Sequence, residues 1–262
     1  MKPESLHIIY FSPTHTSAKI ARSIGKGTGL SHIKEIDLTC DSNTAPLLFR
    51  KDELAIIAAP VYAGRVAPIA KERFKRLKGN NTPAILSVTY GNRDYEDALV
   101  ELRDLTIEQG FIPLAAGAFI GEHSYSRPGM PVAEGRPDLS DTNIAVQFGK
   151  EAIDKIATTL IEPIHPLFIK GNIPYREVKP SSPAAPITLT ELCSLCGECI
   201  GLCPIQAIFI NPAGKIDTDK TKCIKCCACV KDCPNEARIF DTPYTAMLHA
   251  NFSARREPEL FF

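Results

Sequence analysis

The sequence has no tryptophan. It also has no net charge, because its 30 Lys and Arg residues are balanced by 30 Asp and Glu residues. Without a charge excess, no long-range field would draw the chain to nucleic acid or to an anionic membrane surface. No apolar run approaches the length of a membrane span. The residues ahead of the first strand-like run lack the features of a signal peptide. We therefore expect a cytoplasmic protein that binds neither nucleic acid nor membrane.

Cysteine is almost missing from the first 192 residues, where Cys40 stands alone. The other nine cysteines lie between Cys193 and Cys233. A disulfide framework would staple the whole chain, so this crowding argues against one. Thiols gathered in one segment of a chain without a secretory signal indicate a metal site. The 262 residues, 44% of them hydrophobic, suffice for one large domain or two smaller ones.

The crowded cysteines form an internal repeat. Residues 193–204 read CSLCGECIGLCP and residues 223–234 read CIKCCACVKDCP, so both follow the spacing C-x2-C-x2-C-x3-C-P. A shift of thirty residues superposes the two runs. Paired C-x2-C runs also occur in structural zinc sites. Two zinc ions, however, would not need three cysteines at two-residue intervals, twice, with each set followed by Cys-Pro.

The repeated motif resembles the two-cluster bacterial ferredoxins. In these proteins three cysteines of a run hold one 4Fe-4S cube, and the fourth crosses to the other cube. The resemblance implies one cube held by Cys193, Cys196, Cys199 and Cys233, and another held by Cys223, Cys226, Cys229 and Cys203. It also implies that Pro204 and Pro234 turn the chain after each run. The residues expected to shield the cubes from water are Ile200, Ile205, Ile208, Val230 and Ile239.

Two cysteines fall outside this scheme. Cys227 occupies the place that Gly197 has in the first run. We favour a tolerated small side chain there over a ninth ligand. Cys40 precedes a polar, loop-like run and is expected to be a structural or surface thiol.

Strand-like and helix-like segments alternate ahead of the cysteines. Short apolar runs of the buried, parallel type predict five strands, at residues 7–11, 33–38, 53–59, 84–89 and 114–120. Amphipathic stretches predict helices at residues 16–24, closed by Gly25 and Gly27, and at residues 68–77, 94–109 and 141–160. Five strands separated by helices favour an α/β fold with a doubly wound parallel sheet.

Three loops should meet at the carboxyl edge of that sheet, where such folds bind ligands. They span residues 12–17, 60–65 and 90–95. The first loop supplies several hydroxyl groups at the start of a helix, where backbone N–H groups and the helix dipole favour a phosphate. An ordinary Ser/Thr helix cap is the alternative, although one cap needs only one hydroxyl.

Together the three loops resemble the FMN site of flavodoxins, whose first loop wraps the phosphate with hydroxyl and N–H groups. His15 departs from that pattern, since many flavodoxins have Gly or Asn there. The resemblance implies a flavodoxin-like five-stranded sheet that binds FMN, followed by a small α+β bacterial ferredoxin domain. The implied cofactor-binding residues are Ser12, Thr14, His15, Thr16, Ser17, Pro60, Val61, Tyr62, Ala63, Gly64, Tyr90, Gly91, Asn92, Arg93 and Tyr95.

Some of these side chains have more specific expected roles. Because tryptophan is absent, Tyr62 and Tyr90 are the first candidates to stack on the flavin, with surface tyrosines as the alternative. Gly64 and Gly91 would let backbone amides approach the ring. Arg65 and Arg93 are either partners of reduced flavin or solvated loop charges.

A long loop with three prolines spans residues 121–137 and follows the fifth predicted strand. Its length favours a functional cover. His123 lies in it and invites a proton-transfer role, but we favour a polar surface residue.

The expected domain organisation is a flavodoxin-like domain at residues 1–162, a Pro-rich linker at 163–190, a ferredoxin domain at 191–241 and a C-terminal helix and tail at 242–262. The apolar end of the tail is expected to dock back on the body. With GNR after the fourth strand and IKGNIPYRE before the linker, nearly the whole chain resembles the flavodoxin-like/ferredoxin fusion proteins of anaerobic bacteria and archaea.

Cubes pass single electrons and flavin accepts one or two. The resemblance therefore implies an electron carrier that links one-electron and two-electron redox partner proteins of unknown identity. Two alternatives stay open: an FMN-dependent reductase of a small substrate covered by residues 122–137, and a ferredoxin module whose flavodoxin-like half carries no cofactor. Residues 191–240 include six acidic and six basic side chains, so their total charge gives no docking clue. The sequence allows a homodimer.

Overall fold

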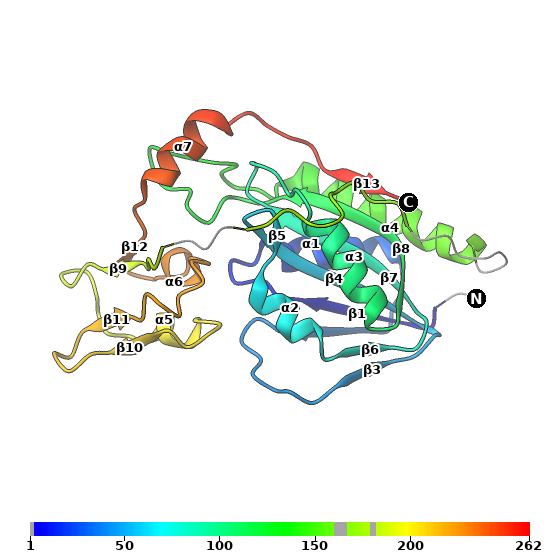
Figure 1. The fold of residues 1–262 in the computed structure, drawn as a ribbon, viewed down its shortest axis with the longest axis horizontal. Helices are drawn as coiled ribbons and strands as arrows, with labels where there is room; N and C mark the ends of the chain where they lie inside the picture. Colours follow the sequence, from blue (N-terminus) through cyan, green and yellow to red (C-terminus); the bar gives the residue numbers. More distant parts are fainter. Residues whose placement is uncertain (1–2, 160–166, 179–181) are drawn as a thin grey trace.

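A parallel sheet of five strands forms the centre of the N-terminal half (Figure 1). This computed structural model describes residues 3–159, 167–178 and 182–262. The strands are β1 (Ser5–Tyr10), β2 (Ile33–Asp37), β4 (Glu53–Tyr62), β7 (Thr82–Tyr90) and β8 (Phe111–Ile120). Their spatial order is β8-β7-β4-β1-β2, and all neighbours are parallel. This is the flavodoxin-like order of the doubly wound sheet, so the predicted fold class is confirmed.

Short strands extend this sheet. β5 (Arg65–Val66) pairs antiparallel with β4, and β13 (Glu259–Phe261) adds an antiparallel edge beside β8. The apolar C-terminal end therefore docks on the body as expected, and it does so as a strand. A separate pair, β3 (Leu47–Phe49) and β6 (Leu77–Gly79), was not predicted. Leu77 was expected to end a helix, but it begins β6.

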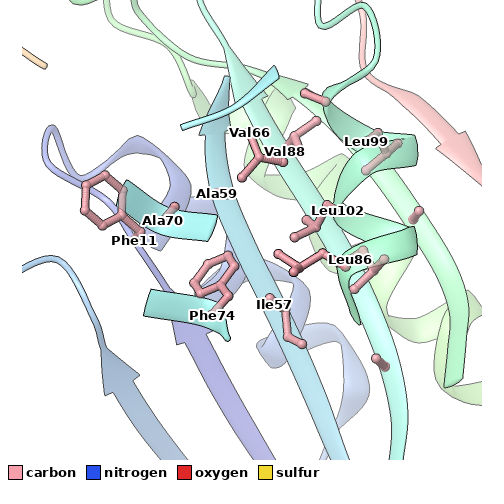
Figure 2. Packing of buried hydrophobic residues seen from close by; sticks show 14 of the residues in the cluster. Phe11, Ile57, Ala59, Val66, Ala70, Phe74, Leu86, Val88, Leu99 and Leu102 are labelled. Atoms are coloured by element: carbon pink, nitrogen blue, oxygen red, sulfur yellow. The ribbon is translucent and has the colours of Figure 1, made fainter. Parts of the chain in front are cut away.

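Helices cover both faces of the sheet (Figure 1). α1 (Thr16–Thr28) and α4 (Leu139–Thr159) lie on the face that includes Ile56, and α2 (Pro68–Phe74) and α3 (Ala98–Glu108) lie on the face that includes Ile57. Successive side chains of a strand point to opposite faces, so a strand covered on both sides needs a near-continuous apolar run. Figure 2 shows the second face, with the following residues packed together: Phe11, Ile57, Ala59, Val66, Ala70, Phe74, Leu86, Val88, Leu99 and Leu102. In the described part of the chain, no helix is both long and apolar enough to cross a membrane.

Helix α1 continues past Gly25 and Gly27, which were expected to end it. It ends at Thr28, and Gly29 follows in the left-handed conformation with φ 67°. Gly27 is instead a packing residue, because a Cβ on it would lie 1.9 Å from the backbone oxygen of Val146 in α4. A Cβ on Gly149 in α4 would likewise lie 2.1 Å from the backbone oxygen of Ile24. The two helices therefore cross with their backbones in direct contact.

The cysteine-rich region folds as a small α+β unit beside the carboxyl edge of the sheet (Figure 1, left). β9 (Ile187–Thr188) pairs with β12 (Arg238–Ile239), and β10 (Ile208–Ile210) pairs with β11 (Ile216–Thr218). The short helices are α5 (Glu198–Gly201) and α6 (Ala228–Lys231), which stand thirty residues apart. Backbone geometry repeats with the sequence, since Leu195 and Lys225 both have φ 58°. The sequence repeat is therefore a structural repeat.

Residues 167–178 pack against the start of α3. Asp97, which precedes that helix, accepts hydrogen bonds from the backbone N–H groups of Asn172 at 2.8 Å and Arg176 at 2.7 Å. Leu167 and Ile169 are buried, whereas Phe168 is 80% exposed. This part of the expected linker is thus held down. The expected boundary at residues 162–163 and the stretch 179–181 lie outside the described residues.

After the cysteines, α7 (Pro243–Asn251) begins with a cap in which Thr242 Oγ1 accepts from the N–H of Tyr244 at 3.1 Å. The chain then crosses back over the sheet half to β13 (Figure 1). The C-terminal part of the chain thereby contacts the flavodoxin-like half twice, through the cysteine-rich unit at the carboxyl edge of the sheet and through β13 beside β8.

We predict that Gly27→Ala destabilises the sheet half. Alanine favours a helix by about 1 kcal/mol over glycine, but its methyl group must push α1 away from α4. Overpacking of this kind costs roughly 1–3 kcal/mol. The midpoint of thermal unfolding, followed by far-UV circular dichroism, should therefore fall. The control is Lys26→Ala on the exposed side of α1, which should leave the midpoint nearly unchanged. A raised midpoint for Gly27→Ala would rule out the close crossing.

Candidate functional site

Four cysteines surround a hollow at each of two places in the C-terminal unit. Hollow I is lined by Cys193, Cys196, Cys199 and Cys233. Hollow II is lined by Cys203, Cys223, Cys226 and Cys229. Each hollow takes three cysteines from one run and the fourth from the other, which is the partition implied by the resemblance to ferredoxins. The cavity volume is ≈ 20 Å³ in each hollow.

The thiols of each hollow ring a space and do not converge on a point. Among the residues that the structure describes, no group of three or more His, Cys, Asp or Glu side chains is placed to hold a metal ion. Four thiolates around a space suit an iron–sulfur cube better than they suit the compact tetrahedron of a zinc site. Backbone N–H groups also point at the sulfurs, with Ala207 N 3.2 Å from Cys203 Sγ and Ala237 N 3.3 Å from Cys233 Sγ. Such bonds stabilise thiolates and tune the potential of a bound cluster.

Cys227 lines hollow II beside the four predicted ligands. It is 1% exposed, and its φ of 61° matches the left-handed conformation of Gly197 in the other run, where φ is 80°. Nothing lies within 4 Å of the place that a Cβ on Gly197 would take. The loop therefore has room for a small side chain at this position. Burial raises the pKa of the Cys227 thiol well above its usual value.

A cleft of about 660 Å³ opens between the carboxyl edge of the sheet and the cysteine-rich unit, and we call it the rim cleft. Its volume lies in the range of cofactor pockets. Ten of the predicted cofactor residues line it: Thr14, Thr16, Pro60, Val61, Tyr62, Ala63, Gly64, Tyr90, Gly91 and Arg93. The loops that leave β1, β4 and β7 thus meet at one edge, as parallel strands require.

Some polar side chains of the first loop make contacts within the protein, and others line the rim cleft. Ser12 and Ser17 are buried, and Ser12 Oγ accepts a hydrogen bond from the N–H of Ala18 at 3.0 Å. Ser12 therefore does the work of a helix cap. His15 extends toward the cysteine-rich unit, where its Nε2 lies 3.0 Å from Asp232 Oδ2. Ser12, His15 and Ser17 do not line the rim cleft, so Thr14 and Thr16 are the residues of the first loop that offer hydroxyl groups there.

Asn92 and Tyr95 also lie outside the rim cleft, contrary to expectation. Asn92 Nδ2 donates to the backbone oxygens of Phe252 at 2.5 Å and Ala254 at 2.8 Å. Tyr95 is fully buried, and its hydroxyl donates to Glu259 Oε2 at 2.9 Å. Both residues anchor the C-terminal tail to the sheet half.

Two further expected flavin partners have structural roles. Arg65 is bound to the buried carboxylate of Glu101, with Nε 3.0 Å from Oε2, and is absent from the cleft lining. Tyr90 belongs to the cleft wall, but its ring packs on Tyr95 with centroids 5.5 Å apart. Of the two tyrosines predicted to stack on the flavin, Tyr62 is the one that is half-buried in the cleft wall. Burial first, and then the thiols of Cys226 and Cys227, raises the pKa of Tyr62 well above its usual value.

The wall of the cleft nearest the cysteine-rich unit is aromatic, and its residues were not predicted. The ring centroid of Tyr125 lies 5.1 Å from that of Phe240 and 6.3 Å from that of Tyr244, and all three residues line the cleft. In a chain without tryptophan, these rings and Tyr62 are suited to cover a planar ligand. The available signal was two aromatic residues directly after the second cysteine run.

Thr89 has a side-chain hydroxyl in the cleft wall that lacks a hydrogen-bond partner among the described residues. Its Oγ1 atom is buried. Buried polar groups are normally hydrogen-bonded. An unpaired hydroxyl in the wall of a cleft therefore fits a site that takes a polar ligand.

His123 closes one side of the cleft. It packs over Gly91, where a Cβ would lie 2.3 Å from the ring Cδ2, and its Nδ1 accepts from the N–H of Tyr125 at 3.1 Å. Burial, with smaller effects from Arg93 and Lys231, lowers the pKa of His123 to about 4. The imidazole is therefore neutral at pH 7, with its proton on Nε2. The residue is part of the cleft and not of the open surface.

Charged contacts fix the cysteine-rich unit to the edge of the sheet. Lys231 in α6 lies 2.5 Å from Glu122 Oε1 and donates to the backbone oxygen of Ser126 at 3.0 Å. Burial alone would raise the pKa of Glu122, but the hydrogen bonds from Lys231 and the Gly135 N–H, together with the charge of Lys231, outweigh burial and lower the pKa. Cys40, the expected surface thiol, lies at the same junction, with Sγ 3.8 Å from the backbone oxygen of Gly201.

One side chain belongs to both a hollow and the cleft. Ile224, next to Cys223, lines hollow II and the rim cleft. The neighbouring Lys225 also reaches the cleft, and its ammonium donates to the backbone oxygen of Ser182 at 2.7 Å. Hollow II is thus directly adjacent to the rim cleft.

Comparison with known proteins adds a likeness for each half. No family model matches the sequence. The C-terminal region is 35% identical over 57 residues to a subunit of the tetrathionate reductase of Salmonella typhimurium, a match that spans 21% of this chain and 23% of that protein. The chain thus matches less than a quarter of that relative's length.

Solved structures with similar chains include rubredoxin oxygen:oxidoreductase from Desulfovibrio gigas, at TM-score 0.44 and 13% identity over 62% of this chain and 38% of that one. Flavodoxin 1 from Bacillus cereus gives TM-score 0.42 and 18% identity over 57% of this chain and 97% of that one. The fold assignment itself rests on the strand order described above.

Replacing single cysteines should separate ligands from the spare thiol. We expect Cys226→Ala to lose about half of the bound iron, because a cube needs all four thiolates. Cys227→Ala, at the adjacent position with similar burial, should keep the full iron content of an anaerobic preparation. Iron and acid-labile sulfide assays per chain give the answer. Equal iron loss in the two variants would contradict the assignment of ligands.

Acid should destabilise the protein through His123. The unfolded chain binds a proton on this residue near pH 6.5, whereas the folded protein does so only near pH 4. Between these values the unfolded state binds more protons, so stability falls as the pH drops from about 6.5 to about 4 and is unaffected above that window. We expect His123→Gln to remove a loss on the order of 2 kcal/mol. Urea midpoints of the folded protein at pH 7 and pH 5 measure the effect, with the exposed His32→Gln as control. The assigned burial would be wrong if both variants kept the wild-type pH dependence.

Proposed function

We propose that this chain is an electron carrier that holds two 4Fe-4S clusters and FMN and links one-electron to two-electron redox partners. The observation that carries the proposal is the position of Ile224, which belongs to both hollow II and the rim cleft. A thiol-lined metal site and a cofactor-sized cleft in direct contact are what electron exchange within one chain requires. We place the protein in the flavodoxin-like/ferredoxin fusion family on the same grounds.

The donor sets support both cofactors. Eight thiols in two rings of four match the needs of two cubes. The cleft at the carboxyl edge offers Thr14 and Thr16 at the start of α1, where the helix dipole favours the phosphate of FMN. Tyr62 and the aromatic wall offer apolar cover for a flavin ring. When bound, these groups would supply single-electron exchange at the clusters and one- or two-electron exchange at the flavin.

The chain's own residues exclude water and set the charge of the site. Ile205 and Ile208 line hollow II, and Tyr125 covers the cleft from the loop at residues 121–137. Neutral His123 adds no charge to the cleft, whereas Arg93 contributes a cation that is paired with Glu96 at 2.6 Å. Thiol-rich centres without disulfides suit a reducing compartment, so we place the protein in the cytoplasm.

A flavin-dependent reductase of a small substrate is the second candidate. It is favoured by the cover that His123 and Tyr125 form over the cleft, because a lid that excludes water serves chemistry as well as electron exchange. The partial likeness to a reductase subunit fits either candidate. Turnover of a small acceptor that disappears when residues 122–137 are shortened would favour the reductase.

The proposal predicts the cofactor content of the full chain purified without oxygen. We expect one flavin with about eight iron and eight sulfide per chain, and flavin that becomes reduced when electrons enter through the clusters. Thr16→Val should weaken flavin retention roughly tenfold or more, because a hydrogen bond to a charged phosphate is worth about 1.5–3 kcal/mol. The exposed Thr44→Val is the control, and neither variant should change the iron count.

Other compositions of that preparation would decide against the proposal. Iron and sulfide without flavin would support a ferredoxin module with an empty flavodoxin-like half. Flavin that stays oxidised after the clusters are reduced would break the link between hollow II and the cleft.

A further inference from the structure

The two cysteine loops are equivalent in the repeat but lie in different surroundings. We call residues 193–199 the outer loop and residues 223–229 the inner loop. Leu195 is 51% exposed and Cys196 is exposed, whereas their equivalents Lys225 and Cys226 are half-buried and 8% exposed. The inner loop faces the rim cleft through Ile224. The outer loop has solvent in the place of the flavodoxin-like half.

Sequence differences between the loops follow this difference in burial. The outer loop has Ser194 and Glu198 where the inner loop has Ile224 and Ala228. Ala228 is 2% exposed, and Glu198 is exposed. At these two positions the docked loop is apolar and the free loop is polar, whereas the pair Leu195 and Lys225 is reversed, because Lys225 lines the rim cleft and Leu195 is exposed. Two copies of one motif in such different surroundings point to two different contacts.

Charge separates the loops more sharply. Around hollow I, residues 191–199 and 233–237 contain Glu191, Glu198 and Glu236, and Arg238, a cation that also lines this hollow, is buried. All three glutamates are exposed. Around hollow II, residues 203–207 and 221–229 contain Lys222 and Lys225, and Asp219 lies 3.9 Å from the ammonium of Lys222. The balanced total charge of this unit therefore hides an acidic outer side.

We propose that the loops divide the work: the inner loop faces the cofactor of the rim cleft, and the outer loop is the docking surface for an external one-electron carrier protein with a basic face. This inference rests on the proposed function. In each exchange the carrier loses one electron and the centre in hollow I gains it, or the reverse, with no proton or chemical group transferred. Three exposed carboxylates around a partly exposed metal site attract cations and repel anions, and added salt screens both effects.

The proposal is tested with two small oxidants of opposite charge, hexaammineruthenium(III) and ferricyanide, acting on the reduced, fully loaded protein. At low ionic strength, Glu198→Lys should slow the reaction with the cation several-fold and accelerate the reaction with the anion several-fold. High salt should remove both changes. The matched control is Glu108→Lys, which makes the same charge change at the exposed end of α3, just before β8 and away from the carboxyl edge. It should alter neither rate.

A second measurement does not depend on electron exchange. Carbodiimide joins carboxylates to lysines in contact, so cross-linking to cytochrome c, a basic one-electron carrier, reports where such a protein docks. Peptide mass mapping should find the links at Glu191, Glu198 and Glu236 and not at Glu108.

The outcomes are distinguishable. If Glu198→Lys and Glu108→Lys behave alike in a preparation with full iron and flavin content, the division of work is overturned and the proposed function stands. Cross-links spread over the sheet half would overturn the docking surface by themselves. A preparation without iron overturns the proposed function instead, and with it this inference, which rests on that function.

Discussion

The crossing of Cys203 and Cys233 between the two hollows is the constraint on which the cysteine-rich unit depends. Cys203 belongs to the first cysteine run but lines hollow II, and Cys233 belongs to the second run but lines hollow I. Neither ring of four thiols is therefore complete unless both runs are folded. The apolar core between them is small, with Ile208 and Ile216 as its buried isoleucines. A unit of this size gains little from burial alone. Under the proposed function, metal binding would supply a large part of its folding free energy, as in other small metal-bound domains.

The same crossing links the two hollows to the junction with the flavodoxin-like half. Lys231 and Asp232 lie between Cys229, which lines hollow II, and Cys233, which lines hollow I. These two residues hold Glu122 and His15 at the edge of the sheet. Exposed ion pairs are individually weak, but under the proposed function the segment that carries them would be fixed at both ends by cluster ligands. Cluster binding would then also order the contacts that keep Ile224 beside the rim cleft.

The parts that the sequence predicted are those written in local patterns. Buried strands show as apolar runs, and the cysteine spacing carries the resemblance to ferredoxins that implied which four cysteines line each hollow. The errors arose where the partner is distant: Asn92 bonds to a backbone oxygen 160 residues away, and nothing near Asn92 signals this. Gly27 has the sequence pattern of a helix end. Its actual role, the close approach of Val146, is a tertiary contact that the local sequence does not show. The aromatic wall was missed because Tyr125 and Phe240 meet only after the two halves dock.

The conformation of Cys227 shows how docking and local geometry trade against each other. A left-handed backbone costs a residue with a Cβ about 1–2 kcal/mol relative to glycine. The outer loop avoids this cost with Gly197, where no atom lies within 4 Å of the place that a Cβ would take. The inner loop is packed against the flavodoxin-like half, where an unfilled space would lose contacts on every side. A buried thiol at 1% exposure recovers those contacts. Cys227 therefore lies in the inner loop, where its burial offsets the strain of the left-handed backbone. The free outer loop has no such contacts to gain and keeps glycine.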